Sequence, residues 1–476
     1  MKILFVASEV APFSKTGGLG DVAGALPPAL AARGHEVHVV TPRYGFIDPA
    51  AWRLERLPAA VQARGESGAL LHGRLGGAHV HLLEHLRFFG SRRGLYGEGG
   101  RDYPDNAQRF AFLTRAALDL PRALGFEPEL VHLHDWQTAL GGWLLRHEHG
   151  HEAWSGRART VYTIHNLAYQ GVFPKEQLPR VGLPWEVFRF EAMEFYDQLN
   201  FMKAGLVFSD AITTVSPNYA REILTPEGGA QLDALLRHRA GQLTGILNGI
   251  DDSWDPAADP HLPASYSRGD LAGKARCKQA LQLELGLAVR KDVPLVAMVG
   301  RLAEQKGVDL VAAALHEIMG SDLQLALLGS GRRDYEDLFQ RASRERPDRI
   351  AVRTGFDEGL AHRIEAGGDV FLMPSRFEPC GLNQMYSLRY GTVPVVRAVG
   401  GLEDTVEDFD GHRIGTGFKF RDYRPAAMMT ALRRALDVYR DARAWRGLQE
   451  RGMAQDFSWA RSAGEYEALF HRLLAR

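Results

Sequence analysis

The sequence predicts an α/β protein built from two doubly wound, Rossmann-like domains that face each other across a cleft. Short apolar runs, typical of buried strands, alternate with helical stretches in both halves of the chain. A Pro/Asp-rich segment with the turn chemistry of a linker runs to Pro263 between the halves. The length of 476 residues also suits two or three domains rather than one.

The first half opens with a strand, a glycine-rich loop, a helix and a second strand. Residues 3–7 form a short apolar run, residues 21–33 are rich in alanine and leucine, and residues 36–40 form the next apolar run. This alternation predicts a parallel sheet within a first domain of residues 1–247. Further strands, separated by helical stretches, are predicted at residues 130–134, 160–164 and 211–215.

The second half repeats the pattern in a domain predicted at residues 248–456. Residues 295–300 predict a buried strand that ends in a turn, and residues 323–328 predict another. Because open α/β sheets bind ligands at the carboxyl ends of their strands, we expect the loops after these strands to line the cleft. The series continues at residues 350–352, 370–374 and 393–397.

Composition excludes several classes of protein. The formal net charge of -1 argues against binding to nucleic-acid backbones, which requires an excess of basic residues. The only two cysteines, Cys277 and Cys380, form no C-x-x-C pair, which favours a reducing compartment. No apolar stretch approaches the roughly 20 residues that cross a bilayer, and the N-terminal apolar run has no cleavage site. We therefore expect a cytoplasmic protein that binds neither nucleic acid nor membrane.

A glycine-rich loop, KTGGLGD at residues 15–21, follows the first predicted strand. Glycines between a strand and a helix let backbone N–H groups approach a phosphate at the helix N-terminus, although a plain tight turn has the same pattern. Residues 18–23 also fit G-x-G-x-x-A, the fingerprint of dinucleotide binding. The second strand, however, runs into Thr-Pro-Arg at 41–43, without the carboxylate that would hold a ribose. NAD is therefore not expected.

Two cations follow the strand at 295–300. Arg301 ends that strand, and Lys306 comes one turn later, just before a helix. An arginine fork and a lysine point charge at a strand end suit the diphosphate of a leaving group. Solvated surface charge is the alternative interpretation.

Two further loops follow strands in the same half. Residues 374–382 read PSRFEPCGL and place Glu378 directly after a predicted strand. Residues 400–406 read GGLEDTV, so Gly401 and Thr405 belong to a second glycine-rich approach to phosphate. Each could be an ordinary loop, but the two together at strand ends predict a ligand site.

Two patterns invite a metal assignment. His132 and His134 lie on the same face of a predicted strand, but no third ligand is evident nearby. Asp408 and Asp410 imitate the D-x-D motif of metal-dependent sugar transferases, but they lie in a polar stretch typical of a surface loop. No metal and no cofactor is expected, because the arginine–lysine pair would do the electrostatic work of a metal.

Several motifs occur in the order in which they recur in one family. They are KTGGLGD at 15–21, HDW at 134–136, TIHN at 163–166, LNGID at 247–251, GRL at 300–302, QKG at 305–307 and PSRFEPCG at 374–381. The chain resembles bacterial glycogen synthases and plant starch synthases over essentially its whole length. This resemblance implies the GT-B fold, with the active site between the two Rossmann-like domains. It also implies a C-terminal helix within residues 457–476 that returns to the first domain.

The resemblance further implies roles for individual residues. Glu378 matches the carboxylate essential for transfer, Arg301 and Lys306 match the pair that neutralises the leaving diphosphate, and His165 matches the histidine beside the transferred glucose. Phe356 stands where the family places an aromatic ring against adenine. The other matching donor positions are Lys15, Gly17, Gly18, Asp21, Asn248 and Cys380, and Gly381, Leu382, Gly401 and Thr405 from the loops after strands complete the predicted donor site.

One position departs from the wider GT-B group. That group often carries a second glutamate eight residues after the first, and Tyr386 stands there in this chain. The glycogen synthase branch commonly lacks this glutamate, so we interpret Tyr386 as a mark of the branch rather than a lost site.

The implied reaction transfers glucose from ADP-glucose to the non-reducing 4-hydroxyl of glycogen or another α-1,4-glucan, releasing ADP with retention of the α configuration. Retaining glycosidases use two nearby carboxylates, whereas Glu378 is the one good candidate here, which favours a front-face route. A transferase that uses UDP-glucose and a catalytically inactive glucan-binding protein are the alternatives. No oligomeric state is predicted.

Overall fold

The computed structural model describes residues 1–410 and 414–475, and the chain divides into two compact units. The first unit comprises residues 1–215, 220–249 and the chain from Trp459 onward. The second unit comprises residues 216–219 and 250–458. The C-terminal segment therefore belongs to the same unit as the N-terminus.

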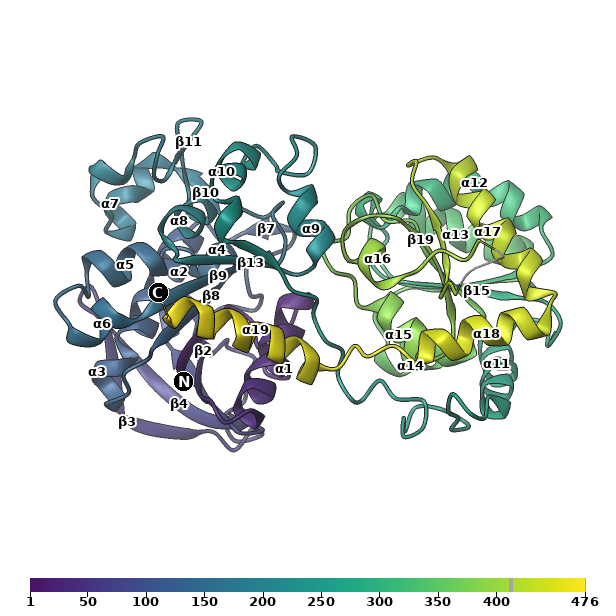
Figure 1. The fold of residues 1–476 in the computed structure, drawn as a ribbon, viewed down its shortest axis with the longest axis horizontal. Coiled ribbons are helices and arrows are strands. Elements are labelled where there is room, and N and C mark those ends of the chain that lie inside the picture. Colours follow the sequence, from purple (N-terminus) through teal and green to yellow (C-terminus); the bar gives the residue numbers. More distant parts are fainter. Residues whose placement is uncertain (411–413, 476) are drawn as a thin grey trace. The chain divides into compact units, whose positions relative to one another are not determined.

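The first unit is built on a large sheet with the strand order β14-β13-β9-β8-β1-β2-β5-β4-β3 (Figure 1). From β14 to β5 all neighbouring strands in this order are parallel. The strands predicted in this half are confirmed, with ends that differ from the prediction by no more than two residues. Their bounds, with those of the additional strands, are β1 (Lys2–Val6), β2 (Glu36–Pro42), β3 (Glu55–Ala63), β4 (Glu66–Leu75), β5 (Ala78–Glu84), β8 (Leu130–His134), β9 (Arg159–Ile164), β13 (Ala211–Thr214) and β14 (Leu243–Gly245).

One edge of this sheet differs from the prediction of a parallel sheet. Strand β4 pairs antiparallel with both β5 and β3. Arg64 and Gly65, with φ of 50° and 80°, form the turn between β3 and β4, and Gly76, with φ of 51°, begins the turn between β4 and β5. Two-residue turns with positive φ match the twist of paired strands and favour hairpins. The prediction was wrong for this edge because it followed the alternation of strands and helices and did not use these turns.

The C-terminal helix completes the first unit. Helix α19 (Trp459–Leu474) packs against α1 (Gly18–Ala32), and Arg33 Nε donates to a carboxylate oxygen of Glu467 at 2.9 Å. The rings of Tyr466 and Phe470 lie 5.5 and 5.7 Å from the ring of His132 in β8. Other helices of this unit are α2 (Asn106–Leu118), α3 (Leu120–Leu124), α4 (Asp135–Thr138), α5 (Gly141–His147), α6 (Ala153–Arg157), α7 (Leu178–Val181), α8 (Phe201–Phe208) and α10 (Asp233–His238).

A small antiparallel sheet lies between β9 and α8 in the chain. It is formed by β10 (Val172–Pro174), β11 (Glu194–Phe195) and β12 (Gln198–Asn200), in the order β10-β12-β11. Figure 1 shows β11 at the margin of the first unit.

The second unit is a doubly wound parallel sheet with the order β17-β16-β15-β18-β19-β20 (Figure 1). In β15, Leu295 and Ala297 belong to one buried cluster, and Val296 and Met298 belong to another. Because side chains alternate along a strand, helices must cover both faces of this sheet. The strand bounds are β15 (Leu295–Val299), β16 (Gln324–Leu328), β17 (Ile350–Arg353), β18 (Val370–Met373), β19 (Val393–Arg397) and β20 (Phe418–Phe420).

Helices α12 and α17 contribute to the cluster that contains Val296 and Met298, and α11 and α14 contribute to the cluster that contains Leu295 and Ala297. The bounds are α11 (Ala272–Leu285), α12 (Val308–Gly320), α13 (Arg333–Glu345), α14 (Glu358–Gly367), α15 (Asn383–Arg389), α16 (Gly400–Thr405), α17 (Pro425–Tyr439) and α18 (Ala442–Met453). Within residues 1–410 and 414–475, no helix combines the length and the apolar character needed to cross a bilayer.

Histidines are concentrated in the sheet of the first unit. His38, His72, His79 and His81 occupy paired positions on β2, β4 and β5, and His38 Nδ1 lies 2.9 Å from His81 Nε2. Burial, reinforced by the neighbouring imidazoles, lowers the pKa of His38 to about 4 and the pKa of His81 to about 2. Burial also lowers the pKa of His132 to about 3. These rings are therefore neutral at pH 7.

We expect the free energy of unfolding to fall as the pH drops below 6.5, the ordinary pKa of histidine. Between pH 6.5 and the lowered pKa of the folded state, each of these histidines binds a proton in the unfolded chain but not in the folded unit. The stabilisation from a buried neutral histidine is therefore complete above pH 6.5 and is lost on acidification. Each such ring lowers the free energy of unfolding by about 1.4 kcal/mol for every pH unit within this window. Urea unfolding at pH about 7.5 and about 5 measures the effect.

Two variants serve as the matched pair for this experiment. His81→Asn should reduce the dependence on pH because it removes one buried imidazole, whereas His151→Asn, at an exposed position, should leave it unchanged. Equal urea midpoints at the two pH values in the unmodified protein would contradict the expectation.

Candidate active site

The predicted site residues follow the carboxyl ends of strands in each unit. In the first unit, the glycine loop follows β1, His165 follows β9 and Asn248 follows β14. In the second unit, Arg301 follows β15, Phe356 follows β17 and Glu378 follows β18. In doubly wound folds this edge of the sheet is the ligand-binding edge.

The glycine loop of the first unit is open where a ligand would approach. A Cβ added to Gly17 or Gly18 would meet no atom within 4 Å, so folding does not require glycine there. By contrast, a Cβ on Gly24 in the middle of α1 would collide with the carbonyl of Ala11. Gly17 caps α1 without a side-chain hydrogen bond, which leaves the first N–H groups of the helix facing the loop. The free space suits a phosphate held by backbone N–H groups.

Two charged residues flank this loop. Lys15 Nζ lies 2.6 Å from a carboxylate oxygen of Asp21, and the lysine side chain is about half exposed. The helix dipole at this end of α1 favours negative charge, and Asp21 already stands in the first turn. The pairing holds the ammonium group of Lys15 beside the first turn of α1.

A buried carboxylate holds the glycine loop in place through hydrogen bonds. Glu9, three residues after the end of β1, accepts hydrogen bonds from the backbone N–H and the hydroxyl of Thr16, the latter at 2.6 Å. It also accepts a hydrogen bond from the hydroxyl of Tyr96. Glu9 therefore fixes the conformation of the residue between Lys15 and Gly17.

His165 is held by two neighbours from the end of β8. Its Nε2 lies 2.9 Å from His134 Nδ1, and its backbone N–H donates to the carboxylate of Asp135 at 2.7 Å. Burial lowers the pKa of His165 to about 3, so the ring is neutral and acts through hydrogen bonds. Burial raises the pKa of Asp135 to about 7, and this residue has the unusual φ of 53°. Backbone strain and a shifted pKa in one residue are typical of functional sites.

Asn248 is buried in the first unit and carries an unsatisfied polar atom. In the described part of the chain, its Oδ1 has no hydrogen-bond partner. Buried polar atoms are normally hydrogen-bonded, so this oxygen is available to a donor group from a ligand.

Lys306 and Glu378 form the central ion pair of the second unit. Lys306 Nζ lies 2.6 Å from Glu378 Oε2, which also accepts a hydrogen bond from the Ser375 hydroxyl at 3.1 Å. The carboxylate is buried, whereas a quarter of the lysine side chain is exposed. Arg301 is exposed, and its Nη2 donates to the side-chain oxygen of Gln305 at 3.0 Å. The structure thus brings both predicted cations to one loop beside the predicted carboxylate.

The loop after β18 packs tightly against the start of α16. The backbone N–H of Gly401 donates to the carbonyl of Glu378 at 3.1 Å, and a Cβ on Gly401 would overlap the carbonyl of Cys380. Gly381 has φ of 71°, a conformation that favours glycine. Thr405 is buried, and its hydroxyl donates to the carbonyl of Gly401 at 2.6 Å. These glycines are required by the fold, in contrast to those after β1.

Leu382 and Phe356 complete the predicted set in the second unit. Leu382 is half-buried immediately before α15. Phe356 is 87% exposed in the loop between β17 and α14. An aromatic ring this exposed at the carboxyl edge of a sheet is suited to stacking against a flat ligand.

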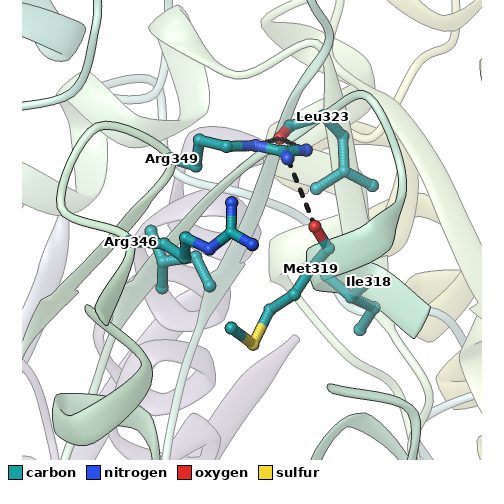
Figure 2. Close-up of a pocket in the computed structure, with 6 residues that line it drawn as sticks. Ile318, Met319, Leu323, Arg346 and Arg349 are labelled. Atoms are coloured by element: carbon teal, nitrogen blue, oxygen red, sulfur yellow. Dashed lines mark hydrogen bonds between the residues drawn. The ribbon is translucent and has the colours of Figure 1, made fainter. Parts of the chain in front are cut away.

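A shallow hollow in the second unit, too small to enclose a ligand, lies at the other edge of the sheet (Figure 2). Leu323 and Arg349 precede β16 and β17, so this hollow is at the amino ends of the strands. The Arg349 guanidinium donates to the carbonyls of Met319 and Leu323, at 3.2 and 3.1 Å. The residues that line this hollow therefore pack the end of α12. The complete lining is Ile318, Met319, Leu323, Arg346, Arg349 and Ile350.

The two metal-like patterns have other partners in the structure. His132 Nε2 lies 2.7 Å from the hydroxyl of Thr163, and His134 contacts His165. Asp408 binds the guanidinium of Arg434 at 3.2 Å. In residues 1–410 and 414–475, no group of three or more His, Cys, Asp or Glu side chains is arranged to hold a metal ion.

Two family models match the chain. The model described as "Starch synthase catalytic domain" matches residues 2–238, and the model described as "Glycosyl transferases group 1" matches residues 286–447. A protein named glycogen synthase from Anaeromyxobacter dehalogenans (strain 2CP-C) is 70% identical over 474 residues, which cover 99% of this chain and 100% of that protein. The chain belongs to the glycogen synthase family.

Less similar relatives support the same membership in the glycogen synthase family. A glycogen synthase from Myxococcus xanthus (strain DK1622) is 50% identical over the whole of both chains. The solved catalytic domain of starch synthase IV from Arabidopsis thaliana, bound to ADP and acarbose, is 36% identical with a TM-score of 0.91. That comparison covers 100% of this chain and 99% of the other. The predicted GT-B fold and the predicted glycosyltransferase class are confirmed.

Two residues that the glycogen synthase motifs did not single out lie next to predicted site residues in the structure. Glu9 supports the glycine loop and Asp135 orients His165. Both follow buried strands, β1 and β8, and this was the available signal. A carboxylate at a strand end becomes meaningful only when its partners are known, and His165 and Tyr96 are distant in sequence from Asp135 and Glu9.

Proposed function

We propose that this enzyme transfers glucose from ADP-glucose to the 4-hydroxyl at the non-reducing end of an α-1,4-glucan, releases ADP and retains the α configuration. The observation that carries the proposal is the Lys306–Glu378 pair beside Arg301, which combines leaving-group cations with a fixed carboxylate. A relative that is 36% identical over the full chain has been solved with ADP and acarbose bound, which supports the same donor and acceptor classes here.

The second unit is proposed to hold the leaving group. In the reaction the bond between glucose C1 and the phosphate oxygen breaks, and its electron pair stays on the diphosphate. Arg301 and Lys306 stabilise that developing negative charge. The acceptor oxygen then bonds to C1, and its proton passes to the departing phosphate oxygen on the same face. Glu378 stabilises the positive charge that develops at C1, while Lys306 and Ser375 fix its Oε2.

The first unit is proposed to contribute the glucose and phosphate contacts. The open glycine loop with Lys15 approaches the diphosphate, and the neutral imidazole of His165 and the unsatisfied Oδ1 of Asn248 bind sugar hydroxyls. Asp21 orients Lys15 through their ion pair. Phe356 in the second unit stacks on adenine.

Nucleotide release from ADP-glucose and from UDP-glucose, each with and without glycogen, tests the proposed function. Glycogen-dependent release of ADP is expected. A preference for UDP-glucose would overturn the proposed donor and keep the fold. Glycogen binding without release from either donor would identify an inactive glucan-binding protein instead. A cytoplasmic location is part of the proposal, because Cys277 and Cys380 form no disulfide, and cell fractionation tests it.

Gly18→Ala is expected to weaken donor binding without destabilising the protein. The added methyl group meets no atom within 4 Å in the folded chain, and alanine favours a helix start by up to about 1 kcal/mol over glycine. The methyl group would, however, stand where the diphosphate approaches the backbone. We expect the KM for ADP-glucose to rise about tenfold or more, close to the cost of one lost charge-assisted hydrogen bond.

Gly24→Ala is the matched control on the same helix. Its Cβ would collide with the Ala11 carbonyl, so it should lower the urea midpoint and leave the KM of the folded enzyme nearly unchanged. If Gly18→Ala lowered the urea midpoint as much as Gly24→Ala did, the glycine would serve the fold rather than the donor.

A further inference from the structure

The turn that carries Lys306 is too short to hold its own shape. It is a single 3₁₀ turn, Glu304–Lys306, and its N-cap residue is Ala303, whose methyl group accepts no hydrogen bond. A helical turn of this length is not stable in isolation, so contacts with other parts of the fold must set its conformation. The position of Lys306 relative to Glu378 therefore depends on what packs against this turn.

The turn packs closely against the loop that follows β18. The backbone N–H of Arg376 in that loop donates to the carbonyl of Gln305 at 2.9 Å. At the end of the turn, Gly307 has φ of 71°, and a Cβ there would collide with the carbonyl oxygen of Pro374. The two loops therefore touch through backbone atoms on both sides of the lysine.

Tyr423 contacts the same turn from a distant part of the chain, between β20 and α17. Its hydroxyl donates to the carboxylate of Asp309, in the first turn of α12, and lies 3.1 Å from the carbonyl oxygen of Glu304. Burial, together with the hydrogen bond to Asp309, raises the pKa of Tyr423 to about 12, so the hydroxyl keeps its proton at pH 7. One hydroxyl thus contacts the chain on both sides of Lys306.

The ring of Tyr423 reaches the second loop. The guanidinium carbon of Arg376 lies 4.5 Å from the centroid of this ring, and that of Arg397, the last residue of β19, lies 5.3 Å from it. Arg397 Nη1 also donates to the carbonyl of Arg376 at 2.6 Å. Guanidinium groups stack favourably on aromatic faces, so these contacts fix Arg376, which shares the short loop after β18 with Glu378.

We infer that Tyr423 is a positioning residue for Lys306. Its hydroxyl fixes the turn on both sides of the lysine, and its ring holds that turn against the loop that carries Glu378. This inference rests on the proposed function for the role of Lys306 as a cation beside the leaving diphosphate. Because that cation acts on charge that develops in the transition state, a displaced Lys306 should lower kcat more than it raises the KM for ADP-glucose.

Tyr423→Phe keeps the ring and removes only the hydroxyl. We expect kcat for glycogen-dependent ADP release to fall about tenfold, less than the roughly 10²-fold that a misplacement of about 1 Å can cost. The KM for ADP-glucose should stay within about twofold of the unmodified value. Tyr439→Phe is the matched control, because the Tyr439 hydroxyl lies 3.0 Å from Lys278 Nζ at the other end of α17, and it should keep kcat within about twofold.

A double-mutant cycle separates positioning from a general loss of stability. In the Lys306→Ala background, Tyr423→Phe should change kcat by less than about twofold, because the group that it positions is absent. A further loss of about tenfold in that background, or kcat within about twofold of the unmodified value in Tyr423→Phe alone, would overturn the inference.

Hydrogen exchange tests the same contacts without turnover. Peptides that cover residues 303–309 should exchange faster in Tyr423→Phe than in the unmodified protein, and at the unmodified rate in Tyr439→Phe. Equal exchange in all three proteins would overturn the inference, whatever sugar the enzyme transfers. Absence of nucleotide release by the unmodified enzyme would instead contradict the proposed function, so the two failures are distinguishable.

Discussion

Glutamine in place of Glu378 is expected to lower kcat by at least a hundredfold while the KM for ADP-glucose changes little. The carboxylate is buried, and two donors fix its Oε2, Lys306 at 2.6 Å and Ser375 at 3.1 Å. Glutamine preserves the shape and an accepting oxygen but removes the charge that faces the developing positive charge at glucose C1. Loss of one preorganised electrostatic partner typically costs about 10²–10³ in kcat, or about 2.7–4 kcal/mol.

A second buried glutamate of the same unit is the control for this substitution. Burial raises the pKa of Glu365 to about 8, so that side chain is largely protonated at pH 7, and it contacts the Ser387 hydroxyl at 2.7 Å. Glutamine resembles the protonated acid, so Glu365→Gln should retain kcat within about twofold. ADP release at saturating glycogen measures both variants. Comparable kcat in Glu378→Gln and Glu365→Gln would contradict the role assigned to Glu378.

Alanine in place of Lys306 is expected to lower kcat by about 10²–10³ as well, by removing a cation from the leaving diphosphate. The same substitution leaves the buried Glu378 without its ion-pair partner, which is destabilising by several kcal/mol when a pair is fully buried and by less here, because the lysine is partly exposed. The loss of activity should therefore exceed what any loss of folded protein explains. Activity per folded molecule, normalised by circular dichroism, separates the two effects.

Lys278→Ala supplies the matched comparison. Lys278 Nζ lies 2.6 Å from a carboxylate oxygen of Asp369, the same separation as in the Lys306–Glu378 pair, but Asp369 precedes β18 whereas Glu378 follows it. Lys278→Ala should lower the urea midpoint and keep kcat per folded molecule. Equal losses of kcat in Lys278→Ala and Lys306→Ala would exclude a specific role for Lys306. Combined with Glu378→Gln, Lys306→Ala should cost less than the product of the single effects, because both remove the same pair.

The strands of this protein could be predicted closely because they are buried on both faces. Residues 130–134 and 393–397 became β8 and β19 with the predicted ends. The antiparallel edge formed by β3, β4 and β5 was missed, although Arg-Gly at 64–65 and Gly-Gly at 76–77 are the kind of turn that joins hairpins. Exposed edge strands carry a weaker apolar signal than central strands, so turns would have been the better evidence there.

Site residues that follow strands were accessible from the sequence, whereas their partners were not. Arg301 and Glu378 could be placed at the ligand-binding edge from the strand pattern alone. The contact of Glu9 with Tyr96 joins residues far apart in the chain, and no local pattern announces it. The same holds for the difference between Gly18, which has free space, and Gly401, which the fold requires. Spacing identifies glycine loops, but only packing tells which glycines serve a ligand.

The place of α19 has a consequence for biosynthesis. The second unit is nearly continuous in sequence, from Ile250 to Ser458, whereas the first unit receives its last helix from the very end of the chain. Tyr466 and Phe470 of that helix pack against His132, which lies two and three residues before His134 and Asp135, the partners of His165. On the ribosome, the first unit must wait uncovered for about 10–40 s, at roughly 5–20 residues per second, while the second unit is made. During translation the order of completion is therefore reversed, and the half that begins first is finished last.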